Sequence, residues 1–524
     1  MWNIVVKFNE QEAKESELEF LNGEIYERMF EHSRINLSFK LKPSVNLLDW
    51  YQNTLPGLVN SVVHVSLADG IDYEAKIVKV NSQKGNADTQ SQISFSCVSD
   101  SFQFDSIIGS DCFVEQLVKD VFSSCSNGVI KVDDSAKITS FRYNETGFNF
   151  IKRIAHEQGF WLYLNNNQWI CKKELSDSNK IELNSNHVSV GMTFNRGFNS
   201  VKTKSYDVAQ NSVLESKKEA TSVASNPFKD VLTAFIGKES PRKLMHPKMP
   251  VNKQVHDDHS TVIAKRLYAN LYFLNVETKE EQLSLGRVFS IDNFGDYRVV
   301  EVSHYFSAHS YRNLVVSIPG EHQAAPGSFT SEFTKPRIPI LGGSVTEIGT
   351  GKNTGFVKVQ YDGVKGISPF IKVSGAGAGA NRGIYFLPEK KDRVLVGFTD
   401  GHPDMPFIIS SHYDGQNKPE IDGNTLKRIK TPSDLFISFN DDKNKNELII
   451  STKDGENSIA VSHTDKKITV EAKNGEVTVS GKTVNIKADD KINMKATEIK
   501  MEGIKIEISG DAQTTIKGGI IKLN

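Results

Sequence analysis

The chain has 524 residues, of which 38% are hydrophobic and 24% are charged, and its formal net charge is −1. This length predicts three or four domains, and the balanced charge argues against general affinity for nucleic acids or membrane surfaces. No run of about 18 apolar residues occurs, so no membrane-spanning helix is predicted. Residues 1–7 lack the basic and apolar segments of a signal peptide, so we expect the chain to stay in the cytoplasm until another route exports it.

Residues 1 to about 105 carry a strand pattern in which apolar and polar residues alternate. The alternation is clean at 35–41, 61–67, 73–80 and 92–98. A hairpin turn is predicted at 70–72. Several alternating strands at regular spacing predict a small β-barrel.

A helical α/β insert is predicted next. Residues 112–122 place apolar side chains at helical spacing, and Asp111 is a good N-cap candidate. A second apolar stripe over 148–158 predicts a helix that ends at Gly159. Residues 160–164 are then predicted as a strand.

The pattern returns to helix at 262–271. Strands are predicted at 286–291 and 296–304. Together with strands from 187–206 and 311–318, they predict a second barrel.

The segment 320–336 is rich in Pro, Ser and Thr and is predicted as a linker. A compact β-domain is predicted over 337–415, with strands at 342–348, 355–361, 370–373, 383–387, 393–397 and 407–411. The alternating Gly and Ala residues of 374–380 are predicted to form a flexible or close-packed loop. Short strands in this number fit a Greek-key barrel of the OB type.

From about 447 to 524 the chain repeats a very short strand every seven to nine residues. Each unit alternates apolar and polar residues, as at 477–479 and 484–486, and such units bury their apolar face only by stacking. The spacing leaves two cross-sections open: a one-chain β-helix coil, or a prism with one side from each of three chains. Single apolar residues inside and the lack of large corner loops fit the thin shared core better.

Four segments resemble one family. Residues 393–411, RVLVGFTDGHPDMPFIISS, resemble the hallmark of VgrG-type spike proteins, which occur in type VI secretion systems and related contractile injection machines. The following HYDGQNKP, 412–419, is similar to the exit from that family's OB domain. YNETGF at 143–148, which leads through a helix to GFW, is similar to a helix–strand unit of the family's hub, and YRVVEVSH at 297–304 is similar to the strand that closes the hub.

The resemblance covers the chain in the family's order. It implies a mainly β fold with α+β insertions: a hub of two small β-barrels (1–336), an OB-fold domain (337–415), a linker or neck (416–446) and a β-helical needle (447–524). It implies a homotrimer whose needle is an intertwined, triple-stranded β-helix. It further implies a hexameric tube protein of the Hcp type at the hub base and a PAAR-type protein on the tip.

Three segments contain residue types that catalysis or binding uses, but each has a plainer interpretation. His256-Asp257-Asp258-His259 has metal-ligand types, yet it precedes a predicted helix whose N-terminus such residues suit. The glycines of 375–379 lack GxGxxG spacing, and 349–352 lacks full P-loop spacing. The four cysteines lack CxxC spacing and are predicted to be free, buried thiols. We therefore predict no catalytic, metal or cofactor site.

The chain ends on apolar residues, and an exposed apolar end of a rod favours a cap. We predict that the tip protein binds Ile520, Ile521, Lys522, Leu523 and Asn524.

The leading hypothesis is a non-enzymatic, trimeric spike that punctures target membranes and delivers effectors, with no role for nucleic acid. No lysozyme-like domain lies between the OB segment and the repeat, and no toxin domain follows Asn524, so a built-in enzyme is not expected. One alternative is a phage-like baseplate hub with cell-wall hydrolase activity. Another is a β-helical adhesin or carbohydrate-binding fibre, but residues 447–524 contain no Trp, Tyr or Phe to line a sugar groove.

Overall fold

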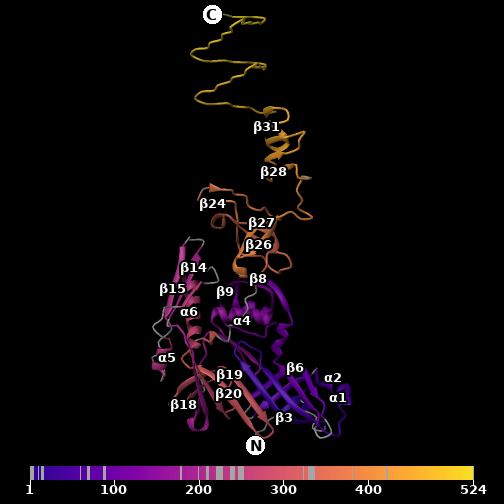
Figure 1. Ribbon diagram of the computed structural model, residues 1–524, viewed down its shortest axis with the longest axis vertical. Helices are drawn as coiled ribbons and strands as arrows, with labels where there is room; N and C mark the ends of the chain where they lie inside the picture. Colours follow the sequence, from indigo (N-terminus) through magenta and orange to yellow (C-terminus); the bar gives the residue numbers. More distant parts are fainter. Residues whose placement is uncertain are drawn as a thin grey trace. The chain divides into compact units, whose positions relative to one another are not determined.

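The computed structural model divides the chain into two units, Met1–Lys418 and Pro419–Asn524, and Figure 1 traces their elements. It describes residues 5–9, 11–12, 17–59, 61–67, 71–85, 90–176, 180–198, 200–207, 212–219, 228–236, 242–245, 253–322, 324–327, 337–380, 382–420 and 423–522. The predicted linker at 320–336 and the turn at 70–72 lie partly outside these residues.

The N-terminal part of the first unit is built from paired strands and two short helices. Its elements are β1 (Val5–Phe8), β2 (Gln11–Glu12), β3 (Leu18–Arg28), β4 (Arg34–Leu41), α1 (Leu47–Asn53), α2 (Leu55–Val59), β5 (Val62–Leu67), β6 (Ile71–Gln83) and β7 (Gln92–Val98). The four alternating segments are confirmed as β4, β5, β6 and β7. Their inward side chains share one core, in which the rings of Phe39 and Phe95 lie 5.8 Å apart between centroids.

Thirteen strands from both parts of the hub form one sheet. The later members are β12 (Ile181–Leu183), β13 (Ser189–Phe194), β17 (Tyr272–Thr278), β18 (Val288–Ile291), β19 (Gly295–Ser307) and β20 (Tyr311–Pro319). The order β13-β17-β20-β19-β3-β4-β7-β6-β5-β1-β2 places β19 antiparallel to β3, with Glu301 opposite Arg28. Two buried cores lie along this sheet, and the N-terminal core also contains Phe306 and Tyr311.

The predicted second barrel is therefore correct in part. Strands β18, β19, β20 and β13 belong to the large sheet, as expected. Strand β14 (Ser200–Asp207) instead pairs with β15 (Ser212–Glu219) and β16 (Arg242–Met245) in a separate sheet. Helix α6 (Lys253–Ala269) packs on β14 and β15, and α5 (Lys229–Ile236) lies between β15 and β16 in the chain.

The α/β insert differs from expectation at its first helix. Its elements are η1 (Asp100–Asp105), β8 (Ile108–Leu117), α3 (Val118–Cys125), β9 (Lys137–Thr146), α4 (Gly147–Gln158), β10 (Trp161–Asn165), β11 (Gln168–Lys172) and η2 (Ser185–His187). The helix predicted at 112–122 is wrong up to residue 117, because β8 pairs with β9 there and Asp111 lies opposite Arg142 instead of capping a helix. Helix α4 is confirmed, and it ends at Gly159 with φ 80°.

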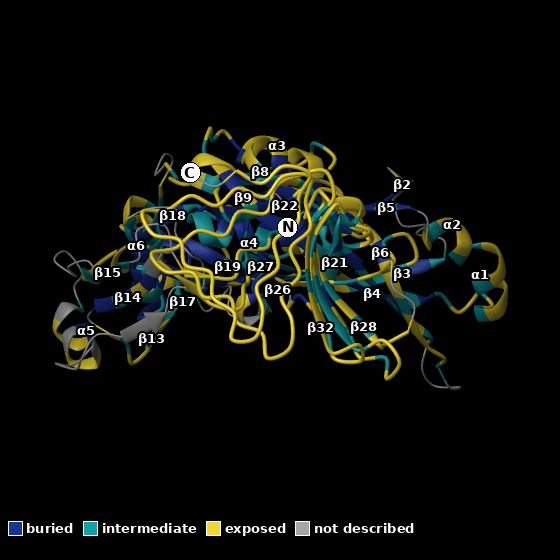
Figure 2. Cartoon of the chain, turned by 90° about the horizontal axis from the view of Figure 1, so that it is seen from above, coloured by how far each residue is buried: buried dark blue, intermediate teal, exposed yellow. Residues whose placement is uncertain are grey.

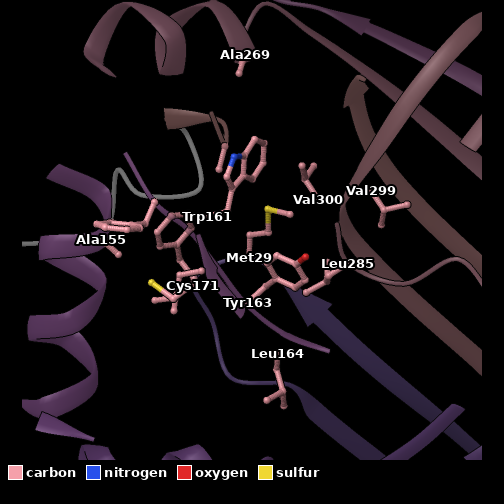
Figure 3. Packing of buried hydrophobic residues seen from close by; sticks show 14 of the residues in the cluster. Met29, Ala155, Trp161, Tyr163, Leu164, Cys171, Ala269, Leu285, Val299 and Val300 are labelled. Atoms are coloured by element: carbon pink, nitrogen blue, oxygen red, sulfur yellow. The ribbon is translucent and has the colours of Figure 1, made fainter. Parts of the chain in front are cut away.

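The insert shares a core with the C-terminal strands of the hub. Figure 3 shows Met29, which follows β3, close to Trp161 and Tyr163 of β10. Val300 of β19 belongs to the same cluster. This core explains why residues 161–164 of β10 are buried on both faces of the strand.

The OB segment is a closed barrel of five strands. These are β21 (Leu341–Ile348), β22 (Phe356–Tyr361), β23 (Ile371–Val373), β26 (Arg393–Phe398) and β27 (Pro406–Ser411), with short turns η4 (Gly351–Asn353) and η5 (Thr399–Gly401). The strand predicted at 383–387 is wrong. Strand β23 pairs directly with β27, so the barrel closes without it. The Gly-Ala loop instead forms a small ribbon, β24 (Ala378–Gly379) with β25 (Arg382–Gly383).

The second unit begins with an antiparallel sheet of five strands in chain order. These are β28 (Leu426–Lys430), β29 (Phe436–Asn440), β30 (Glu447–Ser451), β31 (Asn457–Ser462) and β32 (Lys467–Ala472), with η6 (Lys453–Gly455) between β30 and β31. Strands β28 and β29 lie in the range predicted as linker or neck, 416–446. Described residues 473–522 contain no strand or helix, and they are exposed throughout (Figure 2).

Candidate functional site

The His-Asp-Asp-His segment lies inside α6, not before it, so the predicted helix start at 262 is wrong. His256 is buried, and its Nε2 lies 3.2 Å from Oγ1 of Thr203. That oxygen is also 2.6 Å from Oγ of Ser260, one turn further along α6. The buried face of this turn is polar, which is why apolar periodicity missed it. No group of three potential metal ligands occurs among the described residues.

The four cysteines, Cys97, Cys112, Cys125 and Cys171, are free and buried. Burial raises the pKa of Cys97 to about 12, and that of Cys112 to about 12 with a contribution from Asp404. A thiol with so high a pKa stays protonated and unreactive at neutral pH. Their role is packing, as the sequence predicts.

A cavity of about 1230 Å³ lies in the first unit, lined in part by Glu24, Glu182 and Glu277. Carboxylates facing a cavity are the groups that a glycosidase would use. Glu277 is already paired with Arg312, at 2.8 Å between Oε1 and Nη1. Glu277 is therefore engaged in an ion pair and does not serve as one of two unpaired carboxylates in this cavity.

Residues of the 393–411 segment hold the OB barrel closed. Arg393 donates to Oδ1 of Asp362 at 2.8 Å and lies 3.2 Å from Asp414. The hydrogen bond from Arg393 lowers the pKa of Asp362, and backbone N–H groups of Asn417 and Gln416 lower that of Asp414. These contacts link β26 to the loop after β22 and to the exit of the barrel. Arg393, the first residue of the hallmark segment, thus has a structural role in the barrel.

The loop between β26 and β27 joins the barrel to the hub insert. The Asp404 carboxylate accepts a hydrogen bond from the backbone N–H of Phe141, in β9, at 3.1 Å. The Phe141 ring stacks on Tyr361 and Phe398 of the barrel, at 5.2 and 5.9 Å between centroids. The backbone N–H of Cys112, in β8, donates to the carbonyl of Lys365 at 2.8 Å. Sequence reasoning missed this junction, because nothing near Phe141 marks which domain it faces.

A buried polar chain crosses the N-terminal core of the hub. Glu27 accepts from the Tyr73 hydroxyl at 2.9 Å, and that hydroxyl lies 3.2 Å from Nε2 of His304. On the other side, Nδ1 of His304 lies 2.6 Å from the Tyr311 hydroxyl. All four side chains are buried, so the chain pins β3, β6, β19 and β20 in one arrangement.

The sheet of the second unit presents one apolar face. Register pairs Ile437 with Ile450 and Ile450 with Ile459, so these side chains form a row across three strands. A second row on the same face runs through Phe439, Leu448, Val461 and Ile468. None of these side chains is buried, so the face has no covering layer among the described residues.

The same alternation continues after the sheet, along an extended chain. Every Val, Ile and Met from Val477 to Ile521 is at least 50% exposed. No backbone–backbone hydrogen bond joins residues within 476–522. A strand is defined by its paired neighbours, so the repeat units predicted from 477 onward are extended but form no strands in one chain. We call this extended segment, 476–522, the needle segment.

At its end, the needle segment leaves Ile520 83% exposed and Ile521 half exposed. Lys522 is exposed beside them, and Leu523 and Asn524 lie outside the described residues. The predicted tip-protein site therefore stays a prediction.

In the part of the chain that the structure describes, no helix is both long and apolar enough to cross a membrane.

The OB barrel matches a family model by sequence. A model described as the type VI secretion system/phage-baseplate injector OB domain matches residues 341–413, which include all five barrel strands. The actin cross-linking toxin VgrG1 of Vibrio cholerae is 28% identical over 159 residues, or 29% of this chain. That match spans only 14% of the toxin.

Two solved structures share the fold. An E. coli protein, described as a type VI secretion component with similarity to the T4 tail proteins gp27 and gp5, has a TM-score of 0.51 at 13% identity, covering 78% of this chain and 99% of its own. The half-lidded PdpA–VgrG complex of Francisella gives 0.57 at 11% identity, covering 90% and 87%. The predicted mainly β class with an OB barrel is confirmed, while the three-chain needle stays a prediction. The OB segment of this chain thus matches the injector OB domain of type VI secretion systems and phage baseplates, and the chain shares its fold with a type VI secretion component and a VgrG protein.

Proposed function

We propose that the chain works as a homotrimeric, non-enzymatic spike that punctures a target membrane and carries effectors through it. The observation that carries this proposal is the uncovered apolar face, which begins on the β28–β32 sheet and continues along the needle segment. In water, each exposed Val or Ile that becomes buried contributes about 1.5–3 kcal/mol. Three copies facing one axis would bury all of them and pair the free backbone groups.

The partners follow from the place of the chain in such a machine. The hub would sit on a hexameric Hcp-like tube protein, and the apolar Ile520 and Ile521 would dock a PAAR-type tip protein. The Francisella complex pairs a VgrG protein with PdpA, which supports the binding of a second protein by this fold. The trimer would assemble in the cytoplasm and leave it when the sheath contracts.

Rigid coupling inside the first unit suits this mechanical role. Thrust from a tube would reach the barrel through the Phe141 stack and the strand contacts of β8 with the 365 loop. The E. coli and Francisella relatives named above are a type VI secretion component and a VgrG protein, which supports a role in such a machine. A zymogram of the purified protein on peptidoglycan is expected to show no lysis band, and a band would favour the hydrolase alternative.

The mass of the purified protein in solution tests the trimer. Light scattering is expected to give about three times 58.4 kDa. A monomer at micromolar concentration would contradict the shared needle. A protein that is trimeric yet dispensable for contact-dependent killing of target cells would contradict the puncturing role.

A further inference from the structure

The cavity of about 1230 Å³ in the first unit lies over a polar face of the large sheet, and we call it the hub trough. Glu24 of β3 lies opposite Asn36 of β4 on one side and opposite Tyr305 of β19 on the other. Tyr305 in turn lies opposite Arg312 of β20. Directly opposed residues point to the same face of a sheet, and all four line the cavity. The floor of the trough is therefore a continuous row across β4, β3, β19 and β20.

The two faces of these strands have different environments. Ile25 and Leu37, each one residue along from a floor residue, point the other way and belong to the N-terminal core. On the trough side, Glu182 of β12 and His187 of η2 also line the cavity. The trough is thus bounded by two parts of the hub that are distant in the chain.

The charges that line the hub trough do not balance. The charged lining consists of four carboxylates and two basic side chains: Glu24, Glu182, Glu277, Glu280, Lys279 and Arg312. With four negative and two positive groups, its formal net charge is −2 when His187 is neutral. Glu277 is neutralised by Arg312, whereas Glu24 forms no ion pair with any residue that the structure describes. An unpaired carboxylate in a concave surface attracts a cation.

Arg312 shows which kind of cation this surface accepts. Its Nη1 donates to Oε1 of Glu277 at 2.8 Å, and its guanidinium carbon lies 5.1 Å from the centroid of the Tyr305 ring. A carboxylate and an aromatic face are groups that bind guanidinium and ammonium ions in proteins. Glu24 is the neighbour of Tyr305 on the other side of the row. It therefore offers a carboxylate beside an aromatic ring to a second cation.

Size and polarity indicate a polypeptide as the ligand. Small-molecule pockets are usually about 300–1,000 Å³ and mostly apolar, whereas the hub trough is larger and lined by many charged and polar groups. Permanent interfaces between copies of one chain are also rather apolar, as the exposed face of the β28–β32 sheet is. A charged trough instead favours a partner that binds reversibly, such as a protein that the spike carries and then releases.

We propose that the hub trough holds an extended segment, rich in Arg or Lys, of a protein that the spike carries, and that its basic side chains bind Glu24 and Glu182. This inference rests on the proposed function and adds to it a binding site for the carried protein within the first unit.

Fluorescence anisotropy with the full-length protein tests the site. The probe is a labelled peptide of about twelve residues in which Arg alternates with Thr, so that its basic side chains lie on one side when it is extended. It is expected to bind at low salt and to dissociate in about 1 M salt, where exposed charges are screened. Glu24→Gln should weaken binding at least about threefold, and Glu24→Gln combined with Glu182→Gln about tenfold.

One control and one blocking variant sharpen this measurement. Glu19→Gln is the matched control, because Glu19 is also an exposed residue of β3 but does not line the trough. Asn36→Trp places a large ring on the floor without changing the charge, so it should abolish binding. Peptide binding that is equal in Glu24→Gln, Asn36→Trp and Glu19→Gln would overturn the site. Displacement of the peptide by equimolar spermine would assign the trough to small polyamines and overturn it as well.

Measurements on cells distinguish a carried protein from the tube protein. With Asn36→Trp, release of the tube protein into the medium is expected at the wild-type level, while killing of target cells decreases. Loss of both would assign the trough to assembly of the machine, and unchanged killing would show that the trough carries nothing needed for it. Either result overturns the proposal.

The site and the proposed function can fail separately, because the hub trough lies within one chain. A protein that is trimeric by light scattering but does not bind the peptide overturns the site and leaves the proposed function standing. A monomer that binds the peptide, with the expected loss in Glu24→Gln, contradicts the proposed trimer and leaves the site standing.

Discussion

Single side chains decide how firmly the parts of the first unit are joined. Phe141 is the clearest case, because its ring lies between the insert and the barrel while its backbone is held by Asp404. Its neighbours Tyr361 and Phe398 are both buried. The residue is a poor candidate from sequence alone, since a Phe in β9 is equally suited to the insert's own core.

Truncating Phe141 tests this junction. Phe141→Ala is expected to lower the free energy of unfolding of the first unit by about 3–5 kcal/mol, because it opens a cavity in a stacked aromatic cluster. Phe102→Ala is the matched control, since Phe102 is half exposed and should change stability by less than about 0.5 kcal/mol. Urea unfolding of both variants makes the comparison. Equal effects would mean that the stack does not hold the barrel.

His322 makes the stability of the hub depend on pH. It is buried against Tyr268, at 4.7 Å between ring centroids, and burial lowers its pKa to about 3. The unfolded chain has the higher pKa, about 6.5, so it binds the proton first. Stability is fully present above pH 6.5 and should fall by about 1.4 kcal/mol per pH unit below it.

Replacing the imidazole of His322 should remove this dependence of stability on pH. His322→Phe keeps a ring against Tyr268, so the slope of stability against pH between 6.5 and 4 is expected to decrease by about one proton. The measurement is urea unfolding across that pH range. His309→Phe serves as control, because His309 is exposed. An unchanged slope in His322→Phe would show that other groups dominate.

Secondary-structure elements were predictable where one local pattern determined them. Helix α4 has an apolar stripe and a glycine stop, and the structure has both. The start of α3 was not predictable, because β8 is fixed by β9, a partner about 25 residues away. Helix α6 begins earlier than expected because its first buried turn contacts Thr203 through His256 and Ser260. Apolar periodicity carries no signal for such a contact.

The needle segment is an extended element without backbone hydrogen bonds among its described residues. Its units could be predicted from alternation, but backbone pairing depends on neighbours that the chain does not supply to itself. Val479 illustrates the difference, since it is 72% exposed in one chain although it belongs to the apolar face.

A charge on that face should block assembly. Val479→Asp would place an unpaired carboxylate in the shared core, at a cost of several kcal/mol, so the trimer is expected to weaken or disappear. Thr478→Asp puts the same charge on the outward face and should leave the trimer intact. Light scattering over a dilution series distinguishes them. A normal trimer in Val479→Asp would mean that the inward and outward positions are reversed.

At the scale of the whole molecule, all three buried cores belong to the first unit. The family resemblance predicted the order of its parts. It could not predict that a single sheet runs through both parts of the hub, because the pairing of β19 with β3 joins residues that lie far apart in the chain.

The two units should therefore fold in different ways. Residues 1–418 alone are expected to unfold at nearly the same temperature as the first unit in the full chain. The described residues of 419–524 form no hydrophobic core of their own, so the β signal of this fragment in circular dichroism should depend on concentration, as trimerisation requires. A concentration-independent signal would indicate a one-chain coil.

The pairing of β19 with β3 also has a consequence for synthesis. The N-terminal core needs Phe306 and Tyr311, which the ribosome adds nearly 300 residues after β3. At about 5–20 residues per second, the free edge of β3 waits roughly 15–60 s for its partner. During translation, that edge is a nascent strand open to wrong pairing with other chains.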